Sequence, residues 1–251
     1  MCKSIRSIVR VTLTTRRFQF SASTSRRLIR HIKPLEILGN WWISPFNGQS
    51  RRTYAISVLA HELEPTAVVE TGTFVGSSTQ FFLGMPTVKK VISIESNLAS
   101  YKIASTRYKD FSSDRLELLH GDSKVLFSEV LDSLNPKTTT LLCYLDAHWE
   151  GDIPTIEELK LLARWEGTWL AVVDDFKIPS EIGGGYGFDQ YGDSIVDMSV
   201  IPKDCGLRVY IPNDSSENET GAKRGTAYIF GRYLPSSELM FDKLRLKELI
   251  L

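Results

Sequence analysis

The 251-residue sequence predicts an α/β domain with a mostly parallel sheet and helices on both faces. Short β-branched or apolar runs alternate with segments whose apolar residues recur at helical spacing, which is typical of strand–helix–strand units. In addition, 42% of the residues are hydrophobic and 24% are charged. That is the composition of an ordinary globular protein, and the chain is long enough for one sizeable core.

Seven runs have the composition of buried strands and predict a Rossmann-like, doubly wound, seven-stranded sheet. They are residues 67–69, 91–95, 116–120, 138–145, 169–173, 207–211 and 226–230. Helical spacing predicts helices between the first five of them, and a further helix that begins near Thr53 and is ended by Pro65.

The zero net charge of the chain hides an uneven distribution. Residues 1–35 contain nine of the 30 basic residues and no acidic residue, which leaves 21 basic and 30 acidic residues for the remainder. We therefore expect a basic, poorly ordered N-terminal arm over residues 1–35 and one domain over residues 36–251. The arm has the Arg- and Ser-rich composition of a mitochondrial transit peptide, and equally that of an arm that makes weak peripheral contact with an anionic membrane.

These bulk properties favour some classes of protein over others. The three cysteines are odd in number and fit a reducing compartment rather than a disulfide framework. No run approaches the about 20 apolar residues of a membrane span. We expect a cytoplasmic protein, or a mitochondrial one if the arm is a transit peptide. Because the domain is acidic, we expect no nucleic-acid partner, and no pattern indicates an oligomeric state.

The stretch from Ala67 to Thr79 carries the clearest binding motif. A buried strand runs into a turn with Gly72 and Gly76, and Ser77 stands where a helix begins. Such a turn directs free backbone N–H groups and a helix N-terminus at a ligand, and glycines allow close approach. The spacing Glu-x-Gly-x-x-x-Gly differs from the Gly-x-Gly-x-x-Gly of dinucleotide-binding proteins.

Acidic residues also follow the other predicted parallel strands, at the edge where ligands bind in such sheets. Glu95 lies 23 residues after Gly72, close to the spacing at which a carboxylate meets a ribose. Asp122 has two readings, as a ligand contact and as the N-cap of the next helix. Asp146 ends the fourth strand, and Asp174 and Asp175 end the fifth.

In these residues the sequence resembles the class I S-adenosylmethionine (SAM)-dependent methyltransferases, and the resemblance extends from about Thr53 to Arg232. Val-Glu-Thr-Gly-Thr-Phe and Tyr-Leu-Asp-Ala-His-Trp resemble an uncharacterised, mainly bacterial branch of that family. The resemblance implies a SAM site made by Glu70, Gly72, Thr73, Gly76, Ser77, Glu95, Gly121, Asp122 and Asp146.

The carboxylates after the fourth and fifth strands suggest a cation, because clustered carboxylates repel one another unless a hard ion neutralises them. The arrangement resembles the metal-dependent O-methyltransferases of the catechol and macrocin types, which implies Mg²⁺ held by Asp146, Asp174 and Asp175. His148, two residues beyond Asp146, is the candidate general base. The alternatives are that Asp174 or Asp175 only caps a loop without metal, and that His148 is a structural hydrogen-bonding residue.

The expected function is SAM-dependent O-methylation of a hydroxyl on a small molecule or sugar, with catalysis by His148 and Asp146. The sequence departs from the catechol type because no Lys follows Asp146. Two alternatives remain open: a non-catalytic SAM- or nucleotide-binding module, and a different reaction on the same scaffold, as in relatives assigned as hydroxylases.

Overall fold

One eight-stranded sheet organises the part of the chain that the computed structural model describes, residues 44–148, 153–203, 205–231 and 238–250. The strand order is β10-β8-β9-β5-β4-β1-β2-β3. The bounds are β1 Ala67–Thr71, β2 Lys90–Glu95, β3 Leu116–His120, β4 Thr140–Leu145, β5 Thr168–Asp174, β8 Arg208–Pro212, β9 Thr226–Phe230 and β10 Leu246–Leu249. A separate hairpin joins β6 (Gln190–Tyr191) to β7 (Ser194–Ile195). The predicted arm, residues 1–35, lies outside the described residues.

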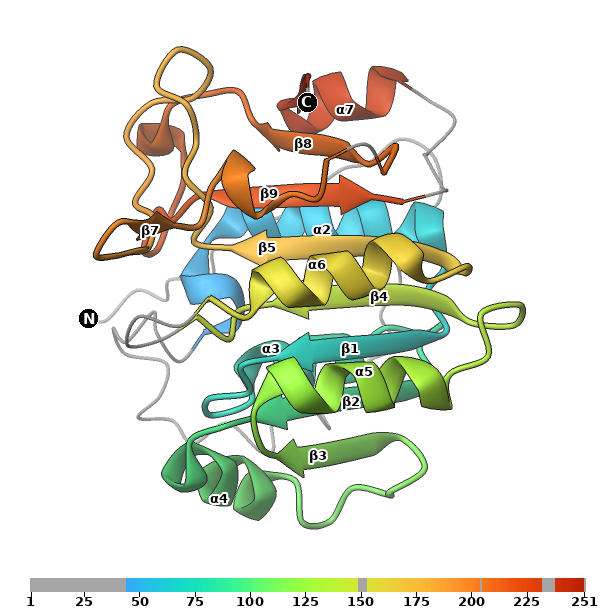
Figure 1. The fold of residues 1–251 in the computed structure, drawn as a ribbon. Helices are drawn as coiled ribbons and strands as arrows, with labels where there is room; N and C mark the ends of the chain where they lie inside the picture. Colours follow the sequence, from blue (N-terminus) through green and yellow to red (C-terminus); the bar gives the residue numbers. More distant parts are fainter. Residues whose placement is uncertain (1–43, 149–152, 204, 232–237, 251) are drawn as a thin grey trace, which may run out of the picture. The chain divides into compact units, whose positions relative to one another are not determined.

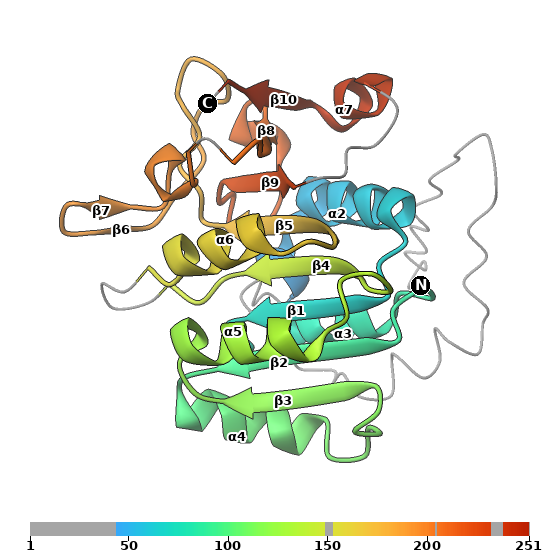
Figure 2. The same cartoon turned by 45° about the vertical axis from the view of Figure 1, so that its right-hand side comes forward.

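The first five strands are parallel to one another, so their carboxyl ends meet at one edge (Figure 1). β1 lies between β2 and β4, so the connections leaving β1 and β4 run to opposite sides of the sheet. This reversal is the position at which open α/β sheets bind ligands. The β6–β7 hairpin lies beyond the same edge in both ribbon views (Figures 1 and 2).

The predicted α/β class is confirmed, but the count of seven strands is wrong by one. The additional strand, β10, pairs antiparallel with β8, with Leu246 opposite Pro212 and Leu249 opposite Val209 (Figure 2). Its buried residues, Leu246 and Leu249, are three apart, so the sequence lacks the period of two that identifies a strand. Arg208 and Glu248 fasten this edge through two hydrogen bonds of 2.5 and 2.6 Å.

Helices cover both faces of the sheet. One face carries α5 (Ser123–Ser133) and α6 (Thr155–Arg164), and the other carries α2 (Ser50–Leu63) and α3 (Ser77–Leu83) (Figure 1). The remaining helices are α4 Leu98–Arg107 and α7 Glu238–Leu244, with short 3₁₀ turns η3 Pro45–Gly48, η4 Met198–Val200 and η5 Ser216–Asn218. None of the helices in the described ranges is long and apolar enough to cross a membrane.

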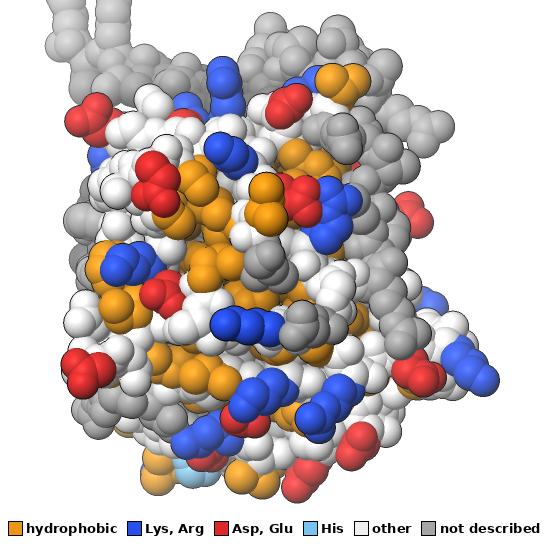
Figure 3. Space-filling view, turned by 45° about the horizontal axis from the view of Figure 1, so that its top comes forward, with side chains coloured by type: hydrophobic (Ala, Val, Ile, Leu, Met, Phe, Trp, Pro, Cys, Tyr) orange, Lys and Arg blue, Asp and Glu red, His pale blue; other side chains and the backbone are white. Residues whose placement is uncertain are grey.

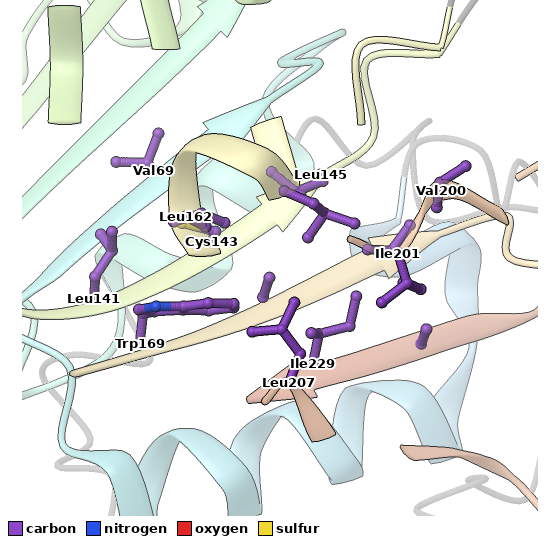
Figure 4. Close-up of a cluster of buried hydrophobic side chains, with 14 of the residues drawn as sticks. Val69, Leu141, Cys143, Leu145, Leu162, Trp169, Val200, Ile201, Leu207 and Ile229 are labelled. Atoms are coloured by element: carbon purple, nitrogen blue, oxygen red, sulfur yellow. The ribbon is translucent and has the colours of Figure 1, made fainter. Parts of the chain in front are cut away.

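Alternate residues of each central strand belong to two separate apolar clusters. Val69 and Cys143 pack with Trp169 on the α5–α6 face (Figure 4), whereas Val68 and Leu142 pack on the opposite face. Because both faces are buried, the strands read as continuous apolar runs. This burial fixes the register of the strands, and with it the positions of the residues that follow their carboxyl ends.

The surface of the described domain carries charges of both signs. On the face shown in Figure 3, basic and acidic side chains are interspersed with apolar ones. Among the residues described on that face, no broad field of one sign appears, and such a field would be needed to steer a polyanion by charge. The expectation of no nucleic-acid partner stays a prediction.

Candidate active site at the carboxyl edge of the sheet

The turn after β1 has the strained backbone that its sequence predicts. Gly72 (φ +87°), Phe74 (φ +48°) and Gly76 (φ +80°) have positive φ. A side chain at Gly72 would put its Cβ 2.2 Å from the backbone oxygen of Asp146. At Gly76 the Cβ would lie 2.5 Å from the ring of Tyr108. The protein's own packing therefore requires both glycines, whatever ligand approaches the turn.

Glu70 connects the end of β1 to β2 and α3. It is fully buried, and its Oε2 accepts hydrogen bonds from the hydroxyls of Thr79 (2.5 Å) and Ser93 (2.6 Å). Thr73 also hydrogen bonds Ser93, at 2.6 Å. Burial raises the pKa of Glu70 from 4.5 to about 7. These contacts join β1, β2 and α3, so Glu70 has a structural role, and its predicted contact with a cofactor stays a prediction.

Glu95 holds the turn from the end of β2. Its side chain accepts the backbone N–H of Phe74 at Oε2 and that of Asn97 at Oε1, each at 2.7 Å. Each carboxylate oxygen can accept a second hydrogen bond. Glu95 therefore fixes the glycine turn and keeps acceptor capacity for a diol.

Gly121 and Asp122 follow β3 beside Glu95. The N–H of Gly121 donates to the backbone oxygen of Glu95 at 3.0 Å. Asp122 is the N-cap of α5, with its side chain accepting the N–H of Lys124 at 2.9 Å. The capping reading of Asp122 is thus realised in the structure, while its side chain is exposed at the same edge. Ser77, the first residue of α3, is buried next to the turn.

Asp174 and Asp175 are adjacent in sequence but point to different partners. Asp174 is fully buried and accepts hydrogen bonds from the Arg52 guanidinium, the Tyr144 hydroxyl and the N–H of Asp175. Burial raises the pKa of Asp174, and the positive charge of Arg52 opposes that effect. Asp174 is therefore engaged in an ion pair that joins α2 to β5, and the structure does not bring it into the cluster described next.

Asp175 has φ +52°, and its side chain contacts Arg224 and His148. Its Oδ1 accepts a hydrogen bond of 2.5 Å from Nε of Arg224. Burial alone would raise the pKa of Asp175, but His148 and Arg224 lower it from 3.8 to about 2. Asp175 is thus ionised, with one oxygen engaged by Arg224 and the other, Oδ2, facing His148 at 3.6 Å.

His148 lies at the centre of this cluster. It is 3% exposed, and its Nε2 lies 3.6 Å from Asp175, 3.7 Å from Asp189 and 3.8 Å from Asp146. Neither ring nitrogen has a hydrogen-bond partner among the residues that the structure describes. Burial lowers the pKa of His148, but the surrounding carboxylates, Asp175 first, outweigh it and raise that pKa above 6.5.

The structure brings together Asp146, His148 and Asp175, whose potential ligand atoms lie within 4.8 Å of one another. The Asp146 side chain is 31% exposed, and partial burial followed by the charges of Asp174 and Asp175 raises its pKa well above the usual range. The Asp146 N–H donates to the oxygen of Thr71 at 2.9 Å, so the cluster adjoins the turn after β1.

Sequence reasoning missed two members of this site. Asp189 accepts hydrogen bonds from Arg224 and from the Tyr191 hydroxyl (2.7 Å), and that hydroxyl also contacts the backbone oxygen of His148 at 3.0 Å. Both Asp189 and Arg224 precede strands, β6 and β9, rather than follow them. The one signal in the sequence is that Asp189 and Tyr191 come shortly after the glycine-rich segment 183–187.

Comparison with solved structures identifies the fold of the chain. A proposed O-methyltransferase from Klebsiella pneumoniae superposes with a TM-score of 0.52 at 14% identity, over 86% of this chain and 92% of that one. The chain has the fold of the class I methyltransferases. The methyltransferase domain of a bacterial Hen1 protein gives a TM-score of 0.50 at 13% identity, over 72% and 97% of the two chains.

A further solved structure matches less well, and two sequence comparisons found no match. An O-methyltransferase from Bacillus cereus in complex with SAH gives a TM-score of 0.49 at 11% identity, over 84% and 92% of the two chains. No family model matches the sequence, and no curated protein matches it. The two superpositions with TM-scores of 0.52 and 0.50, at 14% and 13% identity, show the fold alone.

Proposed function

We propose that the protein is a SAM-dependent methyltransferase that acts on a hydroxyl group of a small molecule or sugar. One observation carries the proposal: a glycine turn clamped by Glu95 adjoins a cluster of Asp146, His148 and Asp175 at the carboxyl edge of a class I methyltransferase fold. The turn is suited to a nucleoside, and the cluster is suited to the activation of a hydroxyl.

The cofactor side of the site consists of the turn, Glu95 and the residues after β3. Glu95 is already held by two backbone N–H groups, so its carboxylate is oriented before a ribose arrives. The two remaining acceptor positions match the two hydroxyls of a ribose. Gly121 and Asp122, which adjoin Glu95, would border the adenine.

The acceptor side consists of the cluster around His148. In methyl transfer, the acceptor oxygen attacks the sulfonium methyl carbon as the carbon–sulfur bond breaks with its electron pair going to sulfur. The products are the methyl ether and S-adenosylhomocysteine, and the hydroxyl proton must pass to a base. In the ion-free site, His148 Nε2 is the candidate base, because the carboxylates around it stabilise the imidazolium that forms.

Calorimetric titration with SAM tests the cofactor half of the proposal. Glu95→Ala is expected to weaken SAM binding by about 1–3 kcal/mol, because the ribose loses an acceptor and the turn loses its clamp. Glu157→Ala, an exposed residue of α6, is the matched control and should leave the affinity unchanged. Equal SAM affinity of wild type and Glu95→Ala, or tighter binding of NAD than of SAM, would contradict the proposal.

Mass spectrometry of a panel of hydroxylated acceptors incubated with SAM tests the reaction. We expect a gain of one methyl group on at least one acceptor, together with stoichiometric S-adenosylhomocysteine. If SAM binds but no acceptor in a broad panel is methylated, the non-catalytic binding module is the better description.

A further inference from the structure

The unusual feature of the site is a buried imidazole that makes no hydrogen bond of normal geometry with a described residue. His148 is 3% exposed, and both of its ring nitrogens lack a partner in the described ranges. A buried polar group left without a partner costs about 1–3 kcal/mol. The three carboxylate oxygens at 3.6–3.8 Å from Nε2 are beyond the about 2.7–3.2 Å of a hydrogen bond. Nε2 therefore lies close to three carboxylates without a hydrogen bond of normal length to any of them.

The distances from Nε2 to Asp146 and to Asp175 are those of ligands that share one ion. Nitrogen and oxygen ligands about 2.0–2.2 Å from a common ion lie about 3–4 Å from each other, depending on the angle between them. Nε2 of His148 lies 3.8 Å from Oδ1 of Asp146 and 3.6 Å from Oδ2 of Asp175. All three donor atoms lie within 4.8 Å of one another.

We propose that Asp146, His148 and Asp175 form a binding site for a first-row divalent transition ion such as Zn²⁺, with His148 Nε2 as one of the ligands. Mg²⁺ is bound almost entirely by oxygen, whereas imidazole selects ions such as Zn²⁺. The ligand set thus differs from the three aspartates expected from the sequence: His148 takes the place of Asp174. Three protein ligands leave coordination positions open, as in catalytic rather than structural sites.

The surrounding residues support this assignment. Arg224 engages Oδ1 of Asp175 and leaves Oδ2 on the side of His148. Asp189 is as close to His148, but its oxygens accept hydrogen bonds from Arg224 and Tyr191. Asp189 therefore orients the site from outside, a role that partners of metal ligands commonly have.

The charges also agree with a divalent ion. Asp174 is neutralised by Arg52 on the other face of the sheet, and Asp189 shares Arg224 with Asp175. Asp146 has His148 as its partner among the described ion pairs, and the charge of Arg52 acts on it from further away. A dication would add positive charge beside this carboxylate, and it would supply Lewis acidity at the acceptor side of the site.

This inference deepens the proposed function, on which it rests only for the use of the ion in methyl transfer. The ion itself can be measured without SAM or acceptor. The 251-residue chain, treated with chelator and dialysed, is titrated calorimetrically with Zn²⁺, Co²⁺ and Mg²⁺, and the visible absorption of bound Co²⁺ reports its ligands. We expect one Zn²⁺ site per chain with a Kd at least about tenfold lower than that of Mg²⁺.

Substitutions test which residues are ligands of the ion. His148→Ala and Asp146→Asn are each expected to weaken Zn²⁺ binding about 100-fold or more and to abolish the rise in Tm that Zn²⁺ gives the wild type. His61→Ala and Asp132→Asn replace an exposed histidine and an exposed aspartate elsewhere, and they should bind as the wild type does. Circular dichroism without metal verifies that each variant is folded, and Asp146→Asn, at a half-exposed position, serves if His148→Ala does not fold.

Two results would overturn the inference: tighter binding of Mg²⁺ than of Zn²⁺, or a folded His148→Ala protein that keeps the Zn²⁺ affinity of the wild type. A parallel titration with SAM keeps the two proposals apart. If SAM binds and no metal ion binds, the metal-site proposal is wrong and the methyltransferase proposal stands. If a metal ion binds and SAM does not, the metal-site proposal stands and the methyltransferase proposal is wrong.

Discussion

Glu158, a buried carboxyl group beside the site, is expected to make the free energy of unfolding depend on pH. It lies on α6, fully buried, and neither of its carboxylate oxygens makes a hydrogen bond of normal geometry to a described residue. Burial raises its pKa from 4.5 to about 7, and the nearby hydroxyls of Ser123 and Thr71 oppose part of that effect. Near neutral pH the folded protein must therefore either keep this proton or bury a charge.

Whether stability rises or falls with pH depends on which state, folded or unfolded, binds the Glu158 proton more tightly. Below pH 4.5 both the folded and the unfolded chain carry the proton. As the pH rises toward about 7, the unfolded chain loses the proton first, so the free energy of unfolding falls. At about 1.4 kcal/mol per pH unit, this interval corresponds to about 3 kcal/mol. Glu158→Gln cannot ionise, so it should escape this loss.

Urea unfolding at several pH values measures the difference directly. Relative to wild type, Glu158→Gln should gain stability steadily as the pH is raised from about 5, reaching about 3 kcal/mol above pH 7, since an amide of the same shape replaces a carboxylate that must ionise. Glu157→Gln is the matched control, because its side chain is 54% exposed on the same helix. A stability difference between Glu158→Gln and wild type that stays constant with pH would refute the reasoning.

Two further predictions concern the turn and the arm. Gly72→Ala should lose at least about 1–3 kcal/mol of stability in thermal unfolding, because its Cβ would lie 2.2 Å from a backbone oxygen, while Gly184→Ala, with nothing within 4 Å, should be nearly neutral. Equal stability of the two variants would contradict the packing argument. Deletion of residues 1–35, which hold nine basic residues, should leave SAM affinity unchanged and weaken the binding of anionic lipid vesicles at low salt. Undiminished vesicle binding would show that the arm is not the lipid contact.

The fold was predictable because the central strands are buried on both faces. Residues 67–69 and 141–145 read as continuous apolar runs, and glycine turns and helical periods separate such runs from each other. β10 was missed because Leu246 and Leu249 lie three apart in a charged segment. Its place in the sheet comes from pairing with β8, which no local period in the sequence encodes.

The candidate site was predictable only as far as strand ends determine it. The carboxyl ends of parallel strands meet at one edge, so Asp146 and Asp175 could be expected near each other and near the turn after β1. The direction of each side chain could not be predicted, because it depends on the backbone of single residues, such as φ +52° at Asp175. Asp189 and Arg224 are 35 residues apart in the sequence, and the fold brings them together.

The ion pair of Asp174, which lies outside the cluster, nevertheless helps to build it. Arg52 binds Asp174 and also donates to the backbone oxygens of Arg224 and Gly225. Gln49 holds the same segment, exchanging hydrogen bonds of 2.9 and 2.6 Å with the backbone of Arg224. The backbone from which the Arg224 side chain reaches Asp175 is therefore fixed from α2. Arg224 can hold Asp175 in place only if its own backbone is rigid. The buried pair of Arg52 and Asp174 therefore helps to set the position of Asp175.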